Sequence, residues 1–263
     1  EPRYGWAEFN ALADRIAARL QREGVGPGKA VALAGFNSAQ HVAVWLGVLR
    51  TGAVAGLITY SATGEQMAAM IADTGGNHLF LDSGAAATLK GFDLGNIQWI
   101  AMDGSDAGEP LMQWMDPEGS APKPVVIAPE SGFNIIYYSG TTGVPKGIVH
   151  SHAMRWQHIQ RGLPAYGPQA VTILSTPMYS NTTMASFLPT LGSGGKVVLM
   201  KKFDARGFLE LAERERATNM MLVPVQYRRI MALPDFDSFD LSSFVMKYST
   251  SAPFAAELKA DVV

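Results

Sequence analysis

Residues 137–147 read YYSGTTGVPKG and combine the residue types that suit contact with a polyphosphate. The three glycines let backbone N–H groups approach an anion closely. The serine and threonine hydroxyls add hydrogen-bond donors, and Lys146 adds a mobile positive charge. Hydrogen bonds from charged groups to ionised phosphate are about twice as strong as neutral ones. We therefore expect a phosphate-binding loop after the apolar run 133–136.

Two common phosphate-binding patterns do not fit this segment. Counted from Gly140, the pattern G-x-x-x-x-G-K-[ST] requires a second glycine where the chain has Pro145, and Gly147 replaces the final Ser or Thr. The dinucleotide-binding pattern G-x-G-x-x-G also fails, because Gly140 and Gly143 lack its leading glycine. From composition alone, a flexible surface turn remains the alternative to a phosphate loop.

The overall composition excludes several classes of protein. Lys and Arg number 21 and Asp and Glu 23, so the net charge is −2 and no basic block predicts a nucleic-acid partner. Cysteine is absent, which excludes disulfides and thiolate chemistry. No run reaches the roughly 18 apolar residues of a membrane span, and no signal-peptide pattern is visible. We expect a soluble, cytoplasmic protein.

Apolar periodicity predicts strands and helices in alternation. This alternation is typical of the α/β class, with parallel sheets covered by helices on both faces. In such sheets ligands bind at the carboxyl ends of strands, where the loop 139–147 stands. A stretch rich in Gly, Pro, Asp and Ser, 103–124, is interpreted as a surface excursion. Helices are predicted over 6–23, from a cap at Ser38 to Gly52, and over 204–216 and 225–233; strands over 30–34, 79–81, 97–101, 133–138, 171–175, 196–200, 220–223 and 244–248.

The order of residues in YYSGTTGVPKG resembles the phosphate-loop signature of the adenylate-forming (AMP-binding) superfamily, in the branch of the acyl-CoA synthetases. Three other blocks resemble the same family, in the family's order. They are RYGWAEFNALADRIAARLQREGVGPGKAVALAGFNSAQHVAVWLGVLRTGAV, TPMYSNTTMASFLPTLGSGGKVVLMKKFD and YSTSAPFAAEL. Because these blocks extend over nearly the whole chain, the flexible-turn alternative is set aside.

The resemblance implies a fold and a division of the chain. The chain 1–263 would be a partial N-terminal AMP-binding domain, made of two stacked parallel-sheet α/β subdomains and incomplete at the C-terminus. The first subdomain would be 36–168, with the phosphate loop, and the second would join 1–35 with 169–263. The family's Mg²⁺-binding Glu, ribose-binding Asp, hinge and adenylation Lys would follow Val263. We therefore expect part of a longer enzyme that is inactive as this fragment.

Family members join a carboxylate to ATP, forming an acyl-adenylate and pyrophosphate, and many then transfer the acyl group to coenzyme A. The implied cofactors are ATP, Mg²⁺ and coenzyme A, and no residue of this chain is assigned as a metal ligand. Mg²⁺ would share the phosphate charge. Thr141 and Lys146 would be catalytic. The β- and γ-phosphates would be held by Ser139, Gly140, Thr141, Thr142, Gly143 and Lys146.

The segment 249–253 resembles the family's adenine-binding loop. It consists of Ser249, Thr250, Ser251, Ala252 and Pro253, where the family often has Gly-Ala-Ala-Pro or Gly-Gly-Ala-Pro. Thr250 and Ser251 are bulkier and more polar than that pattern. A plain strand-to-helix turn, with Pro253 at the helix start, is the alternative.

The resemblance places the acyl pocket at Tyr179, Ser180, Thr183 and Met184. Ser180 replaces a His common in CoA ligases and an Asp that pairs with the ammonium group in amino-acid-activating relatives, so an α-amino acid is disfavoured. Met184 is equally interpreted as a helix-core residue. Lys202 stands where some CoA ligases contact the coenzyme A phosphates, or is a solvated surface lysine.

The function predicted from these features is activation of a hydrophobic fatty or aromatic carboxylic acid, followed by thioester formation with coenzyme A. Two alternatives remain open: an acyl-AMP ligase that loads a carrier protein, and a non-catalytic nucleotide-binding relative. The expected partner is a small carboxylic acid, and a homodimer is compatible with the sequence. We interpret His150 and His152 as structural or exposed.

Overall fold

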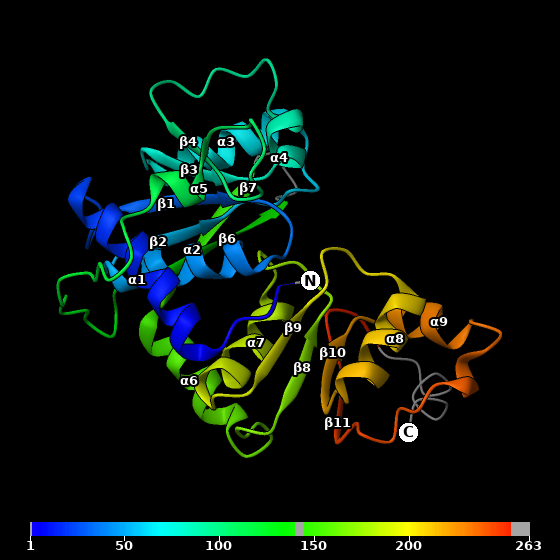
Figure 1. Ribbon diagram of the computed structural model, residues 1–263. Helices are drawn as coiled ribbons and strands as arrows, with labels where there is room; N and C mark the ends of the chain where they lie inside the picture. Colours follow the sequence, from blue (N-terminus) through cyan, green and yellow to red (C-terminus); the bar gives the residue numbers. More distant parts are fainter. Residues whose placement is uncertain (1, 140–144, 254–263) are drawn as a thin grey trace. The chain divides into compact units, whose positions relative to one another are not determined.

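Parallel strands connected by helices form two separate sheets, each in its own compact unit (Figure 1). The computed structural model describes residues 2–139 and 145–253. Unit 1 comprises residues 1–155 and unit 2 residues 156–263. The predicted α/β class with mainly parallel sheets is therefore confirmed.

Unit 1 contains, within its described residues, a seven-stranded sheet of order β5-β4-β3-β1-β2-β6-β7. Adjacent strands in this sheet are parallel except β6 and β7, which form an antiparallel hairpin at one edge. The elements are α1 (Trp6–Arg22), β1 (Ala30–Ala34), α2 (Ala39–Arg50), β2 (Val54–Leu57), α3 (Gly64–Thr74), β3 (His78–Leu81), α4 (Ser83–Thr88), β4 (Gln98–Ala101), β5 (Glu109–Pro110), α5 (Leu111–Trp114), β6 (Gly132–Ser139) and β7 (Pro145–Ser151). Helix α6 (His152–Gly162) runs across the division between the units.

Unit 2 contains, where it is described, a four-stranded parallel sheet of order β11-β10-β8-β9. Its strands and helices alternate along the chain, as the sequence predicted. They are β8 (Val171–Leu174), α7 (Asn181–Gly192), β9 (Lys196–Leu199), α8 (Ala205–Glu215), β10 (Asn219–Leu222), α9 (Pro224–Met231), a 3-10 turn (Phe236–Ser238) and β11 (Met246–Ser249).

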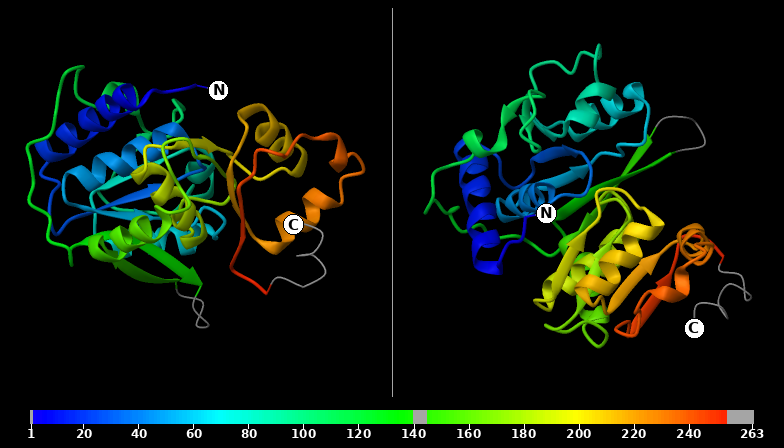
Figure 2. Two further views of the ribbon diagram at one scale, coloured as in Figure 1. Left: turned by 90° about the horizontal axis from the view of Figure 1, so that it is seen from below. Right: turned by 45° about the vertical axis from the view of Figure 1, so that its right-hand side comes forward.

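The order in which the described strands are added reverses direction in both sheets, twice in unit 1 and once in unit 2. In unit 1 the chain moves from β1 to β2 and then crosses back to β3, on the other side of β1. Right-handed crossovers then require α2 and α3 to cover opposite faces, as Figures 1 and 2 show. In unit 2 the same reversal falls between β8 and β10. Ligands of open α/β sheets bind outside the carboxyl ends of strands at such reversals.

The helices follow the predicted periodicity. In α1 the buried residues recur at helical spacing and pack toward α2. Helix α2 begins after Ser38, whose hydroxyl accepts a hydrogen bond from the His41 N–H at 3.0 Å, as predicted for a cap. The buried face of α1 consists of Phe9, Leu12, Ala13, Ile16, Ala17 and Leu20.

The interpretation of 103–124 as a surface excursion is wrong for its central part. Leu111 and Trp114 in α5 are buried, and Trp114 is fully inaccessible to solvent. The Trp114 ring lies edge-on to Phe80, with centroids 5.1 Å apart, and the Arg19 guanidinium lies 5.5 Å from its centroid. The burial of α5 was not predicted, because polar residues flank it on both sides and a single helical turn is too short to show an apolar period.

The division into units also differs from the one expected from the resemblance. Residues 1–35 were assigned to the second subdomain, but β1 pairs with both β2 and β3 inside the sheet of unit 1. Residues 156–168 in turn belong to unit 2. Strand order in a sheet is set by non-local pairing, which the sequence pattern does not specify.

Candidate functional site

The phosphate-loop segment connects the two strands of the β6–β7 hairpin. Gly140, Thr141, Thr142 and Gly143 lie outside the described residues. On either side of them, Ser139 is paired with Pro145, and Tyr138 with Lys146. Lys146 is exposed. The hairpin thus brings the backbone of Ser139 and the cation of Lys146 to the same end of the sheet, although Lys146 was expected in a loop and lies in a strand.

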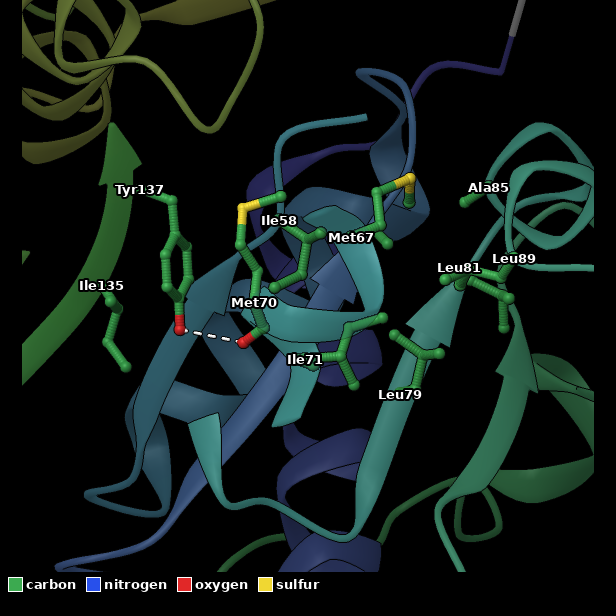
Figure 3. Packing of buried hydrophobic residues seen from close by; sticks show 12 residues of the cluster. Ile58, Met67, Met70, Ile71, Leu79, Leu81, Ala85, Leu89, Ile135 and Tyr137 are labelled. Carbon is green, nitrogen blue, oxygen red and sulfur yellow. Dashed lines mark hydrogen bonds between the residues drawn. The ribbon is translucent and has the colours of Figure 1, made fainter. Parts of the chain in front are cut away.

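Tyr137 joins this hairpin to α3 (Figure 3). Its side chain is buried, and its hydroxyl lies 3.0 Å from both the Met70 carbonyl oxygen and Asp73 Oδ2. Burial and the neighbouring Asp73 carboxylate raise the pKa of Tyr137 far above its ordinary value, so the hydroxyl stays protonated and donates. The position of β6, the strand that leads into the loop, is therefore fixed by a helix 64 residues away in the sequence.

Gly147 permits the close approach of β7 to this anchor. A Cβ at position 147 would lie 2.9 Å from Tyr137 Cε1, 2.9 Å from Ile135 Cγ2 and 3.0 Å from Asp73 Oδ2. These separations are shorter than van der Waals contact. The last glycine of the motif is therefore explained by packing, whereas the sequence suggested only a role in backbone approach to an anion.

The residues after the hairpin are held by packing. His150 is buried in β7, and His152 begins α6 with its ring 4.9 Å from that of Phe133. Burial lowers the pKa of His152. Arg155 is fully buried, donates from Nε to Asn134 Oδ1 at 2.9 Å, and has a pKa lowered by burial to about 10. These contacts agree with the structural interpretation of the two histidines.

In unit 2 the predicted substrate and adenine segments both follow strand ends. The turn 177–180 follows β8, and 249–253 begins at the last residue of β11. The Thr250 N–H donates to the Leu222 carbonyl at the end of β10, at 3.3 Å. Because β11, β10 and β8 are adjacent and parallel, these segments share the carboxyl edge of the sheet, beside its reversal.

The four predicted pocket residues differ in exposure. Tyr179 and Ser180 are half-buried, and Ser180 caps α7 by accepting a hydrogen bond from the Thr182 N–H at 3.2 Å. Thr183 and Met184 are fully buried. The Thr183 hydroxyl donates its proton to the Pro177 carbonyl at 2.5 Å. The Thr176 hydroxyl, which lies 2.7 Å from Thr183 Oγ1, is therefore the donor in the Thr176–Thr183 hydrogen bond. These bonds hold the turn 177–180 against the first turn of α7.

Two further residues of this edge were not identified from the sequence. Thr182 Oγ1 lies 2.7 Å from Ser251 Oγ, and Gln226 Nε2 donates to Ser175 Oγ at 3.4 Å. The Thr182–Ser251 pair is separated by 69 positions. Thr182 lies in a block that resembles the family and Gln226 in a predicted helix, but a local pattern does not specify which distant residue each one contacts.

An apolar cavity of about 40 Å³ lies within unit 2, and none of the four predicted pocket residues lines it. Tyr227 borders this cavity and donates from its hydroxyl to the Tyr248 carbonyl at 2.7 Å, next to the predicted adenine segment. Its walls are Phe208, Leu209, Met220, Tyr227, Ile230, Met231, Phe236, Leu241, Phe244 and Lys247.

The remaining predicted contact is with coenzyme A. Lys202 is an exposed residue after β9. Across 2–139 and 145–253, acidic and histidine side chains do not gather into a group of three suited to a metal ion. In the same ranges every helix is too short or too polar to span a bilayer.

The chain consists of two α/β units with mainly parallel sheets, and β6 and β7 flank its glycine-rich segment. A family model described as "AMP-binding enzyme" matches residues 2–263, so the chain belongs to the AMP-binding enzyme family.

Individual relatives agree with this assignment. Indoleacetate–CoA ligase of Aromatoleum aromaticum is 29% identical over 257 residues, covering 92% of this chain and 49% of that protein. Feruloyl-CoA synthase of an Amycolatopsis species is 27% identical over 256 residues, covering 96% of this chain and 50% of that protein. The chain thus spans about half the length of the curated relatives it matches.

The fold is also that of a solved structure. The inhibitor-bound N-terminal domain of FACL13 from Mycobacterium tuberculosis superposes with a TM-score of 0.88 at 24% identity, covering 98% of this chain and 65% of that one. The expectation of an N-terminal adenylate-forming fold is therefore confirmed.

Proposed function

We propose that the protein carrying this chain uses ATP to activate a hydrophobic carboxylic acid and then forms its thioester with coenzyme A. The observation that carries the proposal is the phosphate motif at the β6–β7 hairpin, within a chain that matches the AMP-binding family over residues 2–263. The two relatives named above, an indoleacetate–CoA ligase and a feruloyl-CoA synthase, support an acid of aromatic type.

The proposed chemistry has two steps. A carboxylate oxygen bonds to the α-phosphorus of ATP while the bond to pyrophosphate breaks, which gives an acyl-adenylate. The coenzyme A thiol then loses its proton, its sulfur bonds to the acyl carbon, and AMP leaves. Both steps depend on holding the reacting groups in line and on neutralising the charge of the leaving group.

The residues of this chain divide between these tasks. The phosphate contact is assigned to Ser139, the loop 140–143 and Lys146, with Thr141 and Lys146 as the catalytic pair. The adenine is assigned to 249–253. The acyl group is assigned to the half-buried Tyr179 and Ser180, with Thr183 and Met184 shaping the pocket from beneath because they are fully buried. Lys202 is assigned to the phosphates of coenzyme A. Mg²⁺ bound to ATP would neutralise phosphate charge.

The test uses the whole polypeptide in which this chain occurs. It is incubated with ATP, Mg²⁺, coenzyme A and a panel of indoleacetic, ferulic, 4-coumaric and C8 to C16 fatty acids, and nucleotides and thioesters are separated by chromatography. We expect AMP, pyrophosphate and a thioester with at least one aromatic acid. AMP without a thioester would instead support carrier-protein loading. The absence of AMP with every acid would overturn the proposed activity.

Lys146 is the variant that tests the loop assignment. Removing one preorganised positive charge from a transition state costs on the order of 100- to 1000-fold in kcat. We expect that loss in Lys146→Ala, measured as acid-dependent pyrophosphate release. Lys90→Ala is the control, because Lys90 is also an exposed lysine of unit 1 but lies beyond α4. Equal rates in the two variants would refute the assignment.

A further inference from the structure

We propose that Thr182 is a positioning residue for nucleotide binding, because its hydroxyl holds Ser251 in a left-handed backbone conformation. The inference rests on the proposed function, which assigns adenine to the segment 249–253. Ser251 has φ 71°, and among the described residues only one other non-glycine residue, Arg216, has a positive φ. Arg216 ends α8 as its C-cap, where this conformation is common. Ser251 ends no helix and follows a strand.

The left-handed conformation is disfavoured for serine, because its Cβ approaches the following carbonyl oxygen. A non-glycine residue keeps such a conformation when its surroundings over-determine it. The contact of 2.7 Å between Thr182 Oγ1 and Ser251 Oγ is the interaction that supplies this constraint. Ser251 itself is exposed, as are Ala252 and Pro253, so packing contributes little to holding the segment.

Thr182 is well suited to act as the fixed partner. It is 8% exposed and lies in the first turn of α7, where the Ser180 hydroxyl accepts its N–H. Its β-branched side chain has few rotamers in a helix. The hydrogen bond therefore ties an exposed segment after β11 to a helix start that the Thr183 bonds hold in place.

The Thr182–Ser251 hydrogen bond affects ATP affinity by changing the fraction of molecules in which Ser251 has the binding-competent conformation. When only a fraction of molecules has the binding-competent conformation, the apparent Kd rises by the inverse of that fraction. Without the Thr182 hydroxyl, Ser251 relaxes toward negative φ and displaces Ala252 and Pro253. A net hydrogen bond of typical strength corresponds to a change of about five- to tenfold. The loss should appear in ATP affinity and leave kcat at saturating ATP unchanged.

The experiment measures the ATP Kd by isothermal titration calorimetry, together with KM and kcat, in the whole polypeptide. Thr182→Val keeps the shape and removes the hydroxyl; we expect about a five- to tenfold weaker Kd, with Thr182→Ser restoring it to within about twofold. In a Ser251→Gly background, Thr182→Val should change the Kd by less than about twofold, because glycine adopts positive φ without strain.

Thr190→Val is the matched control for folding. Thr190 is a fully buried residue of the same helix, and its Oγ1 lies 2.7 Å from Thr172 Oγ1. It lies near the end of α7, whereas Thr182, which contacts the segment 249–253, lies at the start. Thr190→Val should lower the unfolding midpoint without changing the ATP Kd. If Thr182→Val fails to fold, Ser251→Ala removes the same hydrogen bond from the exposed side and should weaken ATP binding to the same extent.

Three results would overturn the inference: an unchanged Kd in Thr182→Val, a loss of affinity in Thr182→Val that is equal with and without Ser251→Gly, or an equal loss in Thr190→Val. A wild-type protein that binds no ATP would refute the proposed function instead. The two failures are therefore distinguishable.

Discussion

Replacing Tyr137 by Phe removes the hydroxyl that joins β6 to α3 and leaves the ring in place. The hydroxyl has one proton and two acceptors at 3.0 Å, a buried carbonyl and a carboxylate. The net loss is that of one hydrogen bond with a partly charged acceptor, about 1.5 kcal/mol of unfolding free energy. For a unit of this size the corresponding fall in Tm is about 3–6 °C.

Tryptophan fluorescence is a suitable probe of this change. Four of the five tryptophans, Trp6, Trp45, Trp99 and Trp114, lie in unit 1, so urea unfolding followed by emission reports mainly on that unit. The midpoint of the variant should fall without a change in the m-value, because the exposed surface is nearly the same.

The dependence on pH gives a second test of the same contact. The folded pKa of Tyr137 is raised, by burial and then by Asp73, above the ordinary value of about 10. The stabilisation is therefore complete below pH of about 10 and is lost at higher pH, as the unfolded tyrosine ionises first. The difference in unfolding free energy between wild type and Tyr137→Phe should shrink from pH 9 to pH 11. A difference that is absent at pH 7, or constant up to pH 11, would refute the reasoning.

Two further substitutions test neighbouring parts of unit 1. Gly147→Ala should lower stability by about 1–3 kcal/mol, because the new Cβ overlaps Tyr137 and Ile135; Gly26→Ala, whose Cβ would meet only the Thr51 carbonyl at 3.7 Å, is the control, and equal urea midpoints would contradict the packing argument. His41 is buried with its pKa lowered by burial, and Nδ1 donates to the Phe36 carbonyl at 3.2 Å. Its unfolded form takes up a proton first as pH falls below about 6.5, so wild type should lose stability from pH 7 to pH 5 relative to His41→Asn, which keeps a donor but does not titrate. If the unfolding free energies of these two proteins changed equally between pH 7 and pH 5, His41 would not be the source of the loss of stability in acid.

The local elements were largely predictable because their burial follows a period. The stripe from Phe9 to Leu20 forms the buried face of α1 as expected, and Ser38 caps α2. Strand β7 was not predicted, because it lies at the edge of the sheet and its residues Ile148 and Val149 are both exposed, which breaks the alternation expected of a strand.

For the candidate site, too, some features were predictable from the sequence and others were not. The family was predictable from the sequence, and the phosphate-binding role of residues 137–147 is a sequence prediction, since both depend on the types and order of neighbouring residues. Three contacts became visible in the three-dimensional structure alone: β1 lies between β2 and β3, the Tyr137 hydroxyl bonds to Met70 and Asp73, and Thr182 bonds to Ser251. A residue pattern indicates which face of an element is apolar, but it does not indicate which distant element covers that face. The partners that hold the motif in position are therefore set by packing between segments more than 60 residues apart.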